Sequence, residues 1–211
     1  MILAIGNIKG GVGKTTLSIN IAIARVLSGL DVLLVDGDEQ RTALTFTDLR
    51  NELTGNTGYT SVSLQGSELR TQVRQLRNKY DDIIIDVGGR DSGSLRAALT
   101  IADTFLIPVQ PRSFDIWAVD QVYELVKEAR EINEQLRVMA VINAADAQGK
   151  DNDEATKAIS EIGGIEMLPI SIGRRKVFPN AASCGQSILE YVPKDIKAVD
   201  ELTSLINKIY N

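Results

Sequence analysis

The sequence predicts an α/β fold in which a doubly wound, mostly parallel sheet is flanked by helices. Three observations lead to this prediction. Short apolar runs alternate with stretches of helical spacing along most of the chain, as in a succession of βα units joined by right-handed crossovers. The runs are continuously apolar, which is typical of strands buried on both faces. Glycines and carboxylates follow several of the runs, where such sheets bind their ligands.

Six apolar runs are the expected strands. Two of them, "DVLLVD" and "DDIIID", consist of branched apolar residues between aspartates. Strands that are buried on both faces have no polar side to alternate with. The expected strands cover residues 2–7, 31–36, 81–86, 104–109, 137–143 and 164–170.

Four stretches have the spacing of amphipathic helices. Residues 15–27, 67–80, 118–132 and 193–211 each repeat apolar side chains every three or four positions, which places them on one face of a helix. In residues 67–80 the apolar residues lie on one face of the expected helix, and Arg70, Arg74 and Arg77 lie on the opposite face. The polar stretch 144–153 is expected to be a loop.

The composition restricts the classes of function. The 211 residues carry a formal net charge of -5 and no histidine, so the usual general base and the commonest zinc ligand are missing. The one cysteine, Cys184, excludes an internal disulfide and is expected to be a small buried residue. No run of about 18 apolar residues predicts a membrane span. We expect one domain over residues 1–211, in a cytoplasmic protein without an N-terminal helix-turn-helix domain.

A phosphate-binding loop follows the first expected strand. Gly6, Gly13, Lys14 and Thr15 fit the pattern G-x-x-x-x-G-K-[ST]. The glycines let backbone N–H groups approach phosphate oxygens, and the helix that follows directs its positive end toward them. Lys14 would neutralise phosphate charge, and the hydroxyl of Thr15 could bind Mg²⁺.

Carboxylates follow two further strands. Asp86 ends "IIIDVGG" in the manner of a Walker B aspartate, and Asp36 and Asp38 follow the run before it, two residues apart and therefore on the same side. Thr15, Asp36 and Asp86 are the expected metal site, and Gly88 and Gly89 would let the chain approach the γ-phosphate.

A second lysine, Lys9, stands at the entry of the loop, where reaching its own γ-phosphate looks awkward. "KGGVGKTT" resembles the deviant Walker A box of the ParA/MinD ATPases. In that family the early lysine crosses a nucleotide-sandwich dimer to the partner's phosphates, and the resemblance implies this role for Lys9. "VDGDEQ" is similar to the family's V-D-x-D-P-Q segment, which implies that Asp38 positions or activates water; Glu39 stands where proline is common.

The resemblance covers nearly the whole chain. It implies Mg²⁺-dependent ATP hydrolysis with Lys9, Lys14 and Asp38 as catalytic residues. Asn143 stands where the family often has an adenine-contacting asparagine, although Ala144 replaces the usual basic residue after it. The implied nucleotide contacts are Gly10, Gly11, Val12, Gly13, Lys14, Thr15, Thr16, Asn143 and Pro169.

Two features indicate the branch of the family. One is that no N-terminal helix-turn-helix domain is expected, and the other is the C-terminal segment. "RRKVFPNAASCGQSILEY" is similar to the tail of small ParA proteins, and the final helix balances three lysines with three acids, which does not favour a membrane. The resemblance implies a dimer that binds DNA without sequence preference and segregates plasmid or chromosome DNA. Its partner would be a ParB-type or small ribbon-helix-helix centromere-binding protein, and it would lie on the nucleoid. Arg174, Arg175 and Lys176 are the expected DNA contacts, and the second set of candidates is Arg70, Arg74, Arg77, Arg90, Arg96 and Arg112.

Three alternatives stay open. A ParA-like ATPase could position a protein cargo on the nucleoid, a MinD-like regulator could bind a membrane, and a ligase or metabolic kinase could use the same loop. A single-site enzyme has no need for a lysine from a second subunit, so Lys9 disfavours the last of these. Phe114 and Trp117 follow "PVQP", and we expect them to pack in the core or, as the alternative, to contact a partner.

Overall fold

The computed structural model describes residues 1–90 and 92–211; within them, the side chains of residues 113–116 are outside the description. Within these residues, seven strands form one sheet in the order β3-β2-β4-β1-β5-β6-β7, and every neighbouring pair is parallel. The strands are β1 Ile2–Ile5, β2 Val32–Asp36, β3 Thr60–Ser63, β4 Asp82–Asp86, β5 Thr104–Val109, β6 Arg137–Ala145 and β7 Glu166–Gly173. The expected α/β fold is confirmed.

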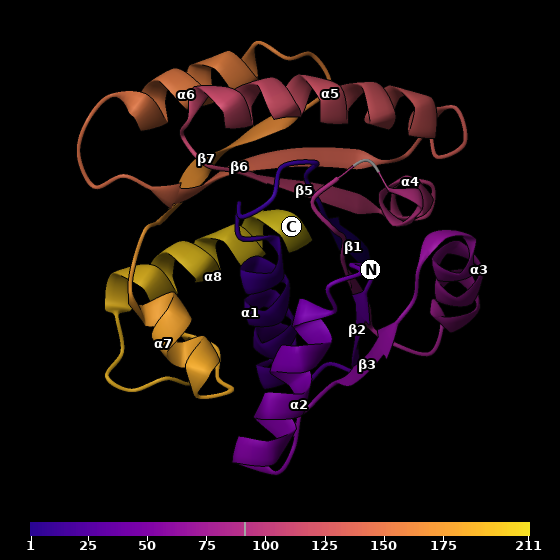
Figure 1. The fold of residues 1–211 in the computed structure, drawn as a ribbon, viewed down its shortest axis with the longest axis vertical. Helices are drawn as coiled ribbons and strands as arrows, with labels where there is room; N and C mark the ends of the chain where they lie inside the picture. Colours follow the sequence, from indigo (N-terminus) through magenta and orange to yellow (C-terminus); the bar gives the residue numbers. More distant parts are fainter. Residues whose placement is uncertain (91) are drawn as a thin grey trace.

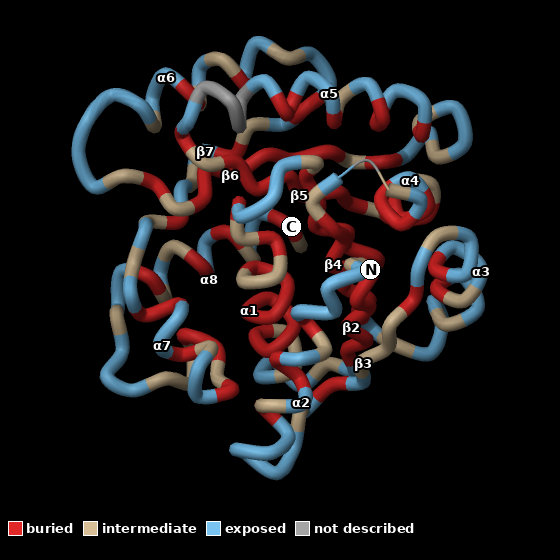
Figure 2. Tube along the Cα trace, in the orientation of Figure 1, coloured by how far each residue is buried: buried red, intermediate tan, exposed pale blue. Residues whose placement is uncertain are grey.

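In the described part of the chain, eight helices connect and cover the strands (Figure 1). They are α1 Lys14–Leu27, α2 Thr42–Thr54, α3 Gly66–Leu76, α4 Gly93–Leu99, α5 Ser113–Arg130, α6 Asp151–Ser160, α7 Val177–Ser183 and α8 Ile196–Tyr210. The buried side chains of α3 to α6 form one apolar cluster on one face of the sheet, and those of α1, α2, α7 and α8 form another on the opposite face. The sheet is therefore the middle of three layers, and Figure 2 shows its central strands almost wholly buried, whereas the edge strands β3 and β7 are partly exposed.

All six expected strands are present, and the structure adds β3. This strand is missing from the prediction because "TSVS" is short, polar and only partly buried at the edge of the sheet. Four helices, α2, α4, α6 and α7, were also not predicted from periodicity. Three of these have 10 residues or fewer, and α6 begins at Asp151, inside the stretch that was expected to be a loop.

The last helix, α8, docks on the sheet through an apolar stripe. Ala198, Leu202, Leu205 and Ile209 are all buried in one cluster with strand residues, whereas Ile196 is 64% exposed. The apolar face of α8 is therefore used inside the fold. None of the described helices is both long enough and apolar enough to cross a bilayer.

Two expectations about single side chains are wrong. Trp117 is 61% exposed on α5 and does not pack in the core. Cys184 follows the last residue of α7 and is exposed, because this turn carries it to the surface rather than beneath the helix. Phe114 is among the side chains outside the description.

Candidate functional site

The site lies at the carboxyl ends of β1, β2 and β4, where three loops meet. The parallel register pairs Asp86 with Ile5 on one side and with Asp36 on the other. The loop after β1 therefore leaves the sheet beside both aspartates. This arrangement brings the phosphate loop and the predicted metal-binding carboxylates together.

The phosphate loop depends on glycine at two points. Gly11 and Gly13 have φ angles of 76° and 89°, in the left-handed region that L side chains rarely adopt. Gly13 also packs against Asn143, so closely that a Cβ atom on Gly13 would lie 2.1 Å from Nδ2 of Asn143. The turn ends at Lys14, the first residue of α1, and no acidic residue occupies the first turn of this helix. Its N–H groups therefore form a positive end next to the loop.

Lys14 and Lys9 occupy different environments. The side chain of Lys14 is buried, and its Nζ donates a hydrogen bond of 3.0 Å to the backbone carbonyl of Lys9. Burial lowers the pKa of Lys14, while the charges of Asp86 and Asp38 act in the opposite direction. Lys9 is exposed. One lysine thus points into the loop and the other lies on its rim.

Asp86 is held by two hydroxyl groups of α1. Thr15 donates to its Oδ2 at 2.6 Å and Ser18 donates to its Oδ1 at 3.0 Å. The carboxyl is fully buried, and burial raises its pKa to about 7, opposed by the hydrogen bond from Thr15 and assisted by the charge of Asp36. A buried carboxylate of this kind favours a nearby cation. The role of Ser18 was missed from the sequence, although it lies one helical turn after Lys14 and so faces the same strand end.

A hydroxyl and a carboxylate side by side are suitable ligands for Mg²⁺. This ion prefers hard oxygen ligands and commonly takes only one or two from the protein, with phosphates and water completing the octahedron. Thr15 and Asp86 bring two such oxygens together, 2.6 Å apart. Within the part of the chain that the structure describes, no group of three or more acidic or cysteine side chains could hold a metal ion.

Asp36 is fully buried and organises its own loop. Its Oδ1 accepts the N–H of Asp38 at 3.1 Å, and its Oδ2 accepts the N–H of Leu44 at 3.0 Å. Burial raises the pKa of Asp36, and these backbone hydrogen bonds oppose the shift. This geometry makes Asp36 a residue that positions Asp38, in addition to a possible ligand of metal-bound water.

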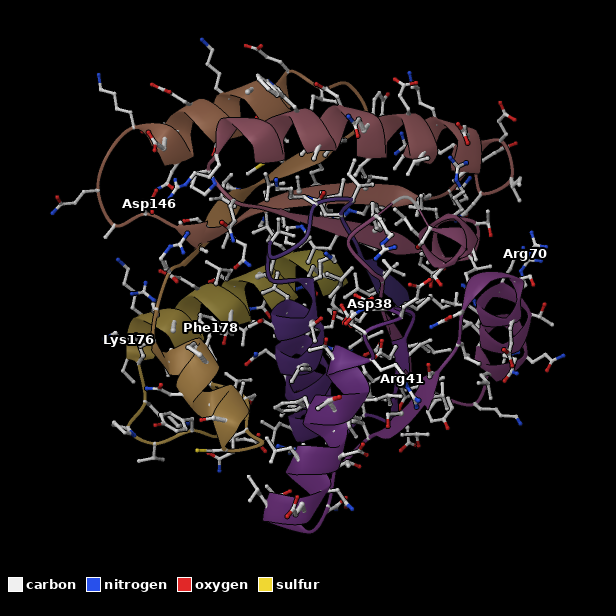
Figure 3. The ribbon with its side chains drawn as sticks, viewed as in Figure 1. Asp38, Arg41, Arg70, Asp146, Lys176 and Phe178 are labelled. Atoms are coloured by element: carbon white, nitrogen blue, oxygen red, sulfur yellow. The ribbon has the colours of Figure 1, made fainter. Side chains whose placement is uncertain are left out.

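Asp38 faces the loop that follows β4. A Cβ atom on Gly88 would lie 3.2 Å from the carboxyl of Asp38, and one on Gly89 would lie 3.2 Å from Nζ of Lys14. Figure 3 shows Asp38 near the centre of the molecule, beside the N-terminal end of α1. The two glycines therefore allow three loops to come together where a terminal phosphate would lie.

A polar cavity of about 350 Å³ opens beside Asp38. Its walls come from the loops after β2 and β4 and from the first residues of α3 and α4. The lining residues are Gly37, Asp38, Glu39, Gln65, Gly66, Ser67, Gly88, Arg90, Ser92, Gly93 and Ser94.

A second cavity, of about 370 Å³, lies on the other side of the phosphate loop. Asn143 donates from Nδ2 to the carbonyl of Val12 at 2.7 Å, and Gln110 donates to the carbonyl of Gly11 at 2.8 Å. Both hydrogen bonds tie the loop to this cavity, which suits a nucleoside. The lining residues are Gly11, Gly13, Thr16, Gln110, Asn143, Ala144, Gly173, Arg174, Arg175, Phe178 and Pro179.

Pro169 does not lie in this cavity. It stands in the middle of β7, whereas the cavity is lined by Gly173 at the carboxyl end of that strand and by Pro179 in α7. The geometry therefore does not support the expected contact between Pro169 and a nucleotide.

The three cations expected to bind DNA are in different environments. Arg175 forms an ion pair of 2.5 Å with Glu201 of α8, and together with Arg174 it lines the second cavity. Lys176 is exposed at the start of α7, on the outer side of the molecule in Figure 3. Arg175 is thus paired with α8, and its side chain is only 21% exposed.

Residues 3–188 match the model of the CobQ/CobB/MinD/ParA nucleotide binding domain. The chain belongs to this family. The loop with both Lys9 and Lys14 places it with the ParA-type members, which are P-loop ATPases with a deviant Walker A motif.

Three similar proteins cover almost the whole chain. The maintenance of carboxysome distribution protein A of Halothiobacillus neapolitanus is 29% identical over 98% of this chain and 95% of its own. The chromosome partitioning protein ParA of Caulobacter vibrioides is 24% identical over 90% of this chain and 86% of its own. The ATP complex of a Cyanothece McdA variant has a TM-score of 0.82, with 17% identity over 98% of this chain and 95% of the other.

Proposed function

We propose that this protein is a Mg²⁺-dependent ATPase that forms an ATP-sandwich dimer and, in that state, binds DNA without sequence preference. Hydrolysis would loosen the dimer and release it from the DNA. The observation that carries the proposal is the pair of lysines in one loop, with Lys14 buried against the loop and Lys9 exposed on its rim.

Lys14, the loop N–H groups and Mg²⁺ would neutralise the phosphates. Thr15 and Asp86 would hold the ion, which supplies positive charge that offsets the charge on the transferred phosphoryl group. Asp38, positioned by Asp36 and next to Gly88, would orient the attacking water. A site without histidine depends on such electrostatic stabilisation.

Lys9 would complete the site of a second subunit. Its backbone carbonyl holds Nζ of Lys14, and among the described residues no carboxylate forms an ion pair with its own side chain. An exposed, unpaired cation beside a phosphate site is placed for a face-to-face partner whose nucleotide lies opposite. The resulting dimer would exist only with nucleotide bound.

The cargo would be plasmid or chromosome DNA, linked by a ParB-type or small ribbon-helix-helix adaptor, in a cytoplasmic protein that associates with the nucleoid. The 24% identity to the Caulobacter ParA supports this function. A protein cargo is the second candidate, because the carboxysome distribution protein is 29% identical over nearly the whole chain. Burial of the apolar stripe of α8 argues against a membrane-bound division regulator.

The test is the variant Lys9→Ala, with the exposed Lys157→Ala of α6 as the control. Light scattering with ATP and Mg²⁺ should show that Lys9→Ala stays monomeric, while its affinity for nucleotide changes by less than about tenfold because Lys14 is intact. Lys157→Ala should dimerise as the wild type does. A dimer fraction of Lys9→Ala equal to the wild type would refute the role of Lys9 in the partner's site.

A further inference from the structure

A row of exposed cations runs along α3 and the turn after it. Residues 66–80 contain four cations and one acid, in a chain whose net charge is -5. Leu69 and Val73 of this segment are completely buried against the sheet, and the cations lie on the exposed side. We define the α3 stripe as Arg70, Arg74, Arg77 and Lys79.

The stripe is available to a ligand. Among the described residues, Arg70, Arg74 and Lys79 form no ion pair, and Arg77 is 52% exposed although it contacts Asp103 at 2.6 Å. Figure 3 shows Arg70 pointing outward from α3. The trio at Arg174 to Lys176 differs, since two of its members line the nucleoside cavity.

We propose that the α3 stripe is the surface that contacts the phosphate backbone of DNA. This inference rests on the proposed function and names the residues through which it acts. Arg70, Arg74 and Arg77 follow one another by four and three positions, so they span about 10 Å along the helix at about 1.5 Å per residue. Phosphates advance by about 3.4 Å per nucleotide along one DNA strand, so the stripe matches a few successive phosphates.

The uncharged residues of the segment also favour DNA over a lipid surface. Gln75 and Asn78 are exposed between the cations, and such side chains commonly donate hydrogen bonds to DNA phosphates. An amphipathic membrane helix would instead expose large apolar side chains. The exposed large apolar residues of the described chain lie elsewhere, at Leu27, Leu53, Trp117, Ile132, Val192 and Ile196.

The start of α3 is linked to the phosphate end of the ATP site. Gly66 and Ser67 line the same cavity as Asp38 and Gly88, and the N–H of Gly66 donates to the hydroxyl of Ser94 at 3.1 Å. Arg70 is one helical turn from these residues. Loops that respond to the terminal phosphate would therefore also set the position of the stripe, which gives a physical reason for DNA binding that depends on ATP.

The test compares R70Q/R74Q/K79Q with K127Q/K150Q/K157Q, a control that removes the same charge from α5, from α6 and from the residue before α6. Arg77 is retained because its ion pair with Asp103 joins α3 to the sheet. Fluorescence anisotropy with a random-sequence DNA duplex, ATP and Mg²⁺ would measure binding between 50 and 200 mM KCl. The slope of the logarithm of the DNA-binding constant against the logarithm of the salt concentration is negative. It should become less steep by about 0.9 for each phosphate that the variant no longer neutralises. At 100 mM KCl the affinity of the α3 variant should fall at least tenfold, and the control should change less than threefold.

Three outcomes would overturn the inference, and they are distinguishable. Wild-type affinity and slope in the α3 variant, with the wild type binding DNA, would reject the stripe but not the proposed function. No ATP-dependent DNA binding by the wild type would reject the proposed function and the stripe together. Binding of the wild type to phosphatidylglycerol vesicles but not to DNA would assign the stripe to lipid. Light scattering should show that the α3 variant still dimerises with ATP.

Discussion

Replacing Arg50 by methionine should destabilise the fold more than a surface substitution would, because Arg50 joins α2 to the segment after α7. Its side chain is only 7% exposed. Nε donates to the carbonyl of Thr57, and Nη1 to that of Gly185, each at 2.8 Å. Nη1 and Nη2 also form a two-pronged contact with the carboxylate of Glu190, both at 2.8 Å.

The size of the loss in unfolding free energy follows from the unpaired carboxylate of Glu190 that the substitution leaves behind. Breaking a buried ion pair by removing one partner costs about 3–5 kcal/mol. Glu190 is 22% exposed, and water can therefore solvate it in part, so we expect the lower end of this range. For a chain of this size, about 3 kcal/mol corresponds to a fall in Tm of about 6–12 °C. Arg74→Met, on an exposed arginine of α3, should change the free energy of unfolding by less than about 0.5 kcal/mol.

The pH dependence gives a second measurement. Burial alone would raise the pKa of Glu190, but the hydrogen bonds from Arg50 and Ser187 outweigh it, and the pKa lies below its ordinary value of 4.5. A depressed carboxyl pKa stabilises the fold above the unfolded-state pKa, and this stabilisation is lost as the pH falls through the folded-state pKa. The difference in stability between wild type and Arg50→Met should therefore be greatest at neutral pH and decrease below about pH 4.5.

Urea unfolding followed by circular dichroism at pH 7 and pH 4 would measure both effects. Adding Glu190→Gln to Arg50→Met should restore part of the lost stability, because it removes the unpaired charge. A free energy of unfolding for Arg50→Met within 0.5 kcal/mol of the wild type at pH 7, or full additivity of the two substitutions, would refute the reasoning.

Two further substitutions test the ATP site. Gly13→Ala should weaken ATP binding at least tenfold and lower the Tm, because its Cβ atom would meet Asn143 at 2.1 Å in a left-handed backbone conformation. The control is Gly163→Ala, whose added Cβ atom has no atom within 4 Å. Equal thermal shifts with ATP in the two variants would contradict the prediction. Asp38→Ala should retain the ATP dimer, while the rate of phosphate release falls about 100-fold or more, as expected when a water-positioning group is lost. The control Glu39→Ala should hydrolyse ATP at nearly the wild-type rate. Hydrolysis by Asp38→Ala at the wild-type rate would show that Asp38 has no catalytic role.

Buried strands and the phosphate loop were predictable because their signals are local. A strand buried on both faces must be apolar throughout, and a loop that wraps phosphate must contain glycine at particular turns. The same reasoning explains why some strands and helices were not predicted. The edge strand β3 is partly exposed and short, and the helices α4 and α7 have only seven residues each, so none of them leaves a periodic pattern in the sequence.

The sequence by itself determined the fold class, the phosphate loop, the carboxylates at the strand ends and the presence of two lysines. These features depend on residue type and on spacing along the chain. Tertiary structure alone decided which side chains meet: Ser18 with Asp86, Arg50 with Glu190, and Arg175 with Glu201. It also distinguished Arg175, whose side chain is 21% exposed and lines a cavity, from the exposed cations of the α3 stripe. The physical reason is that a side chain's partners come from elements distant in sequence, and only their packing decides whether a charge is satisfied inside the fold or left for a ligand.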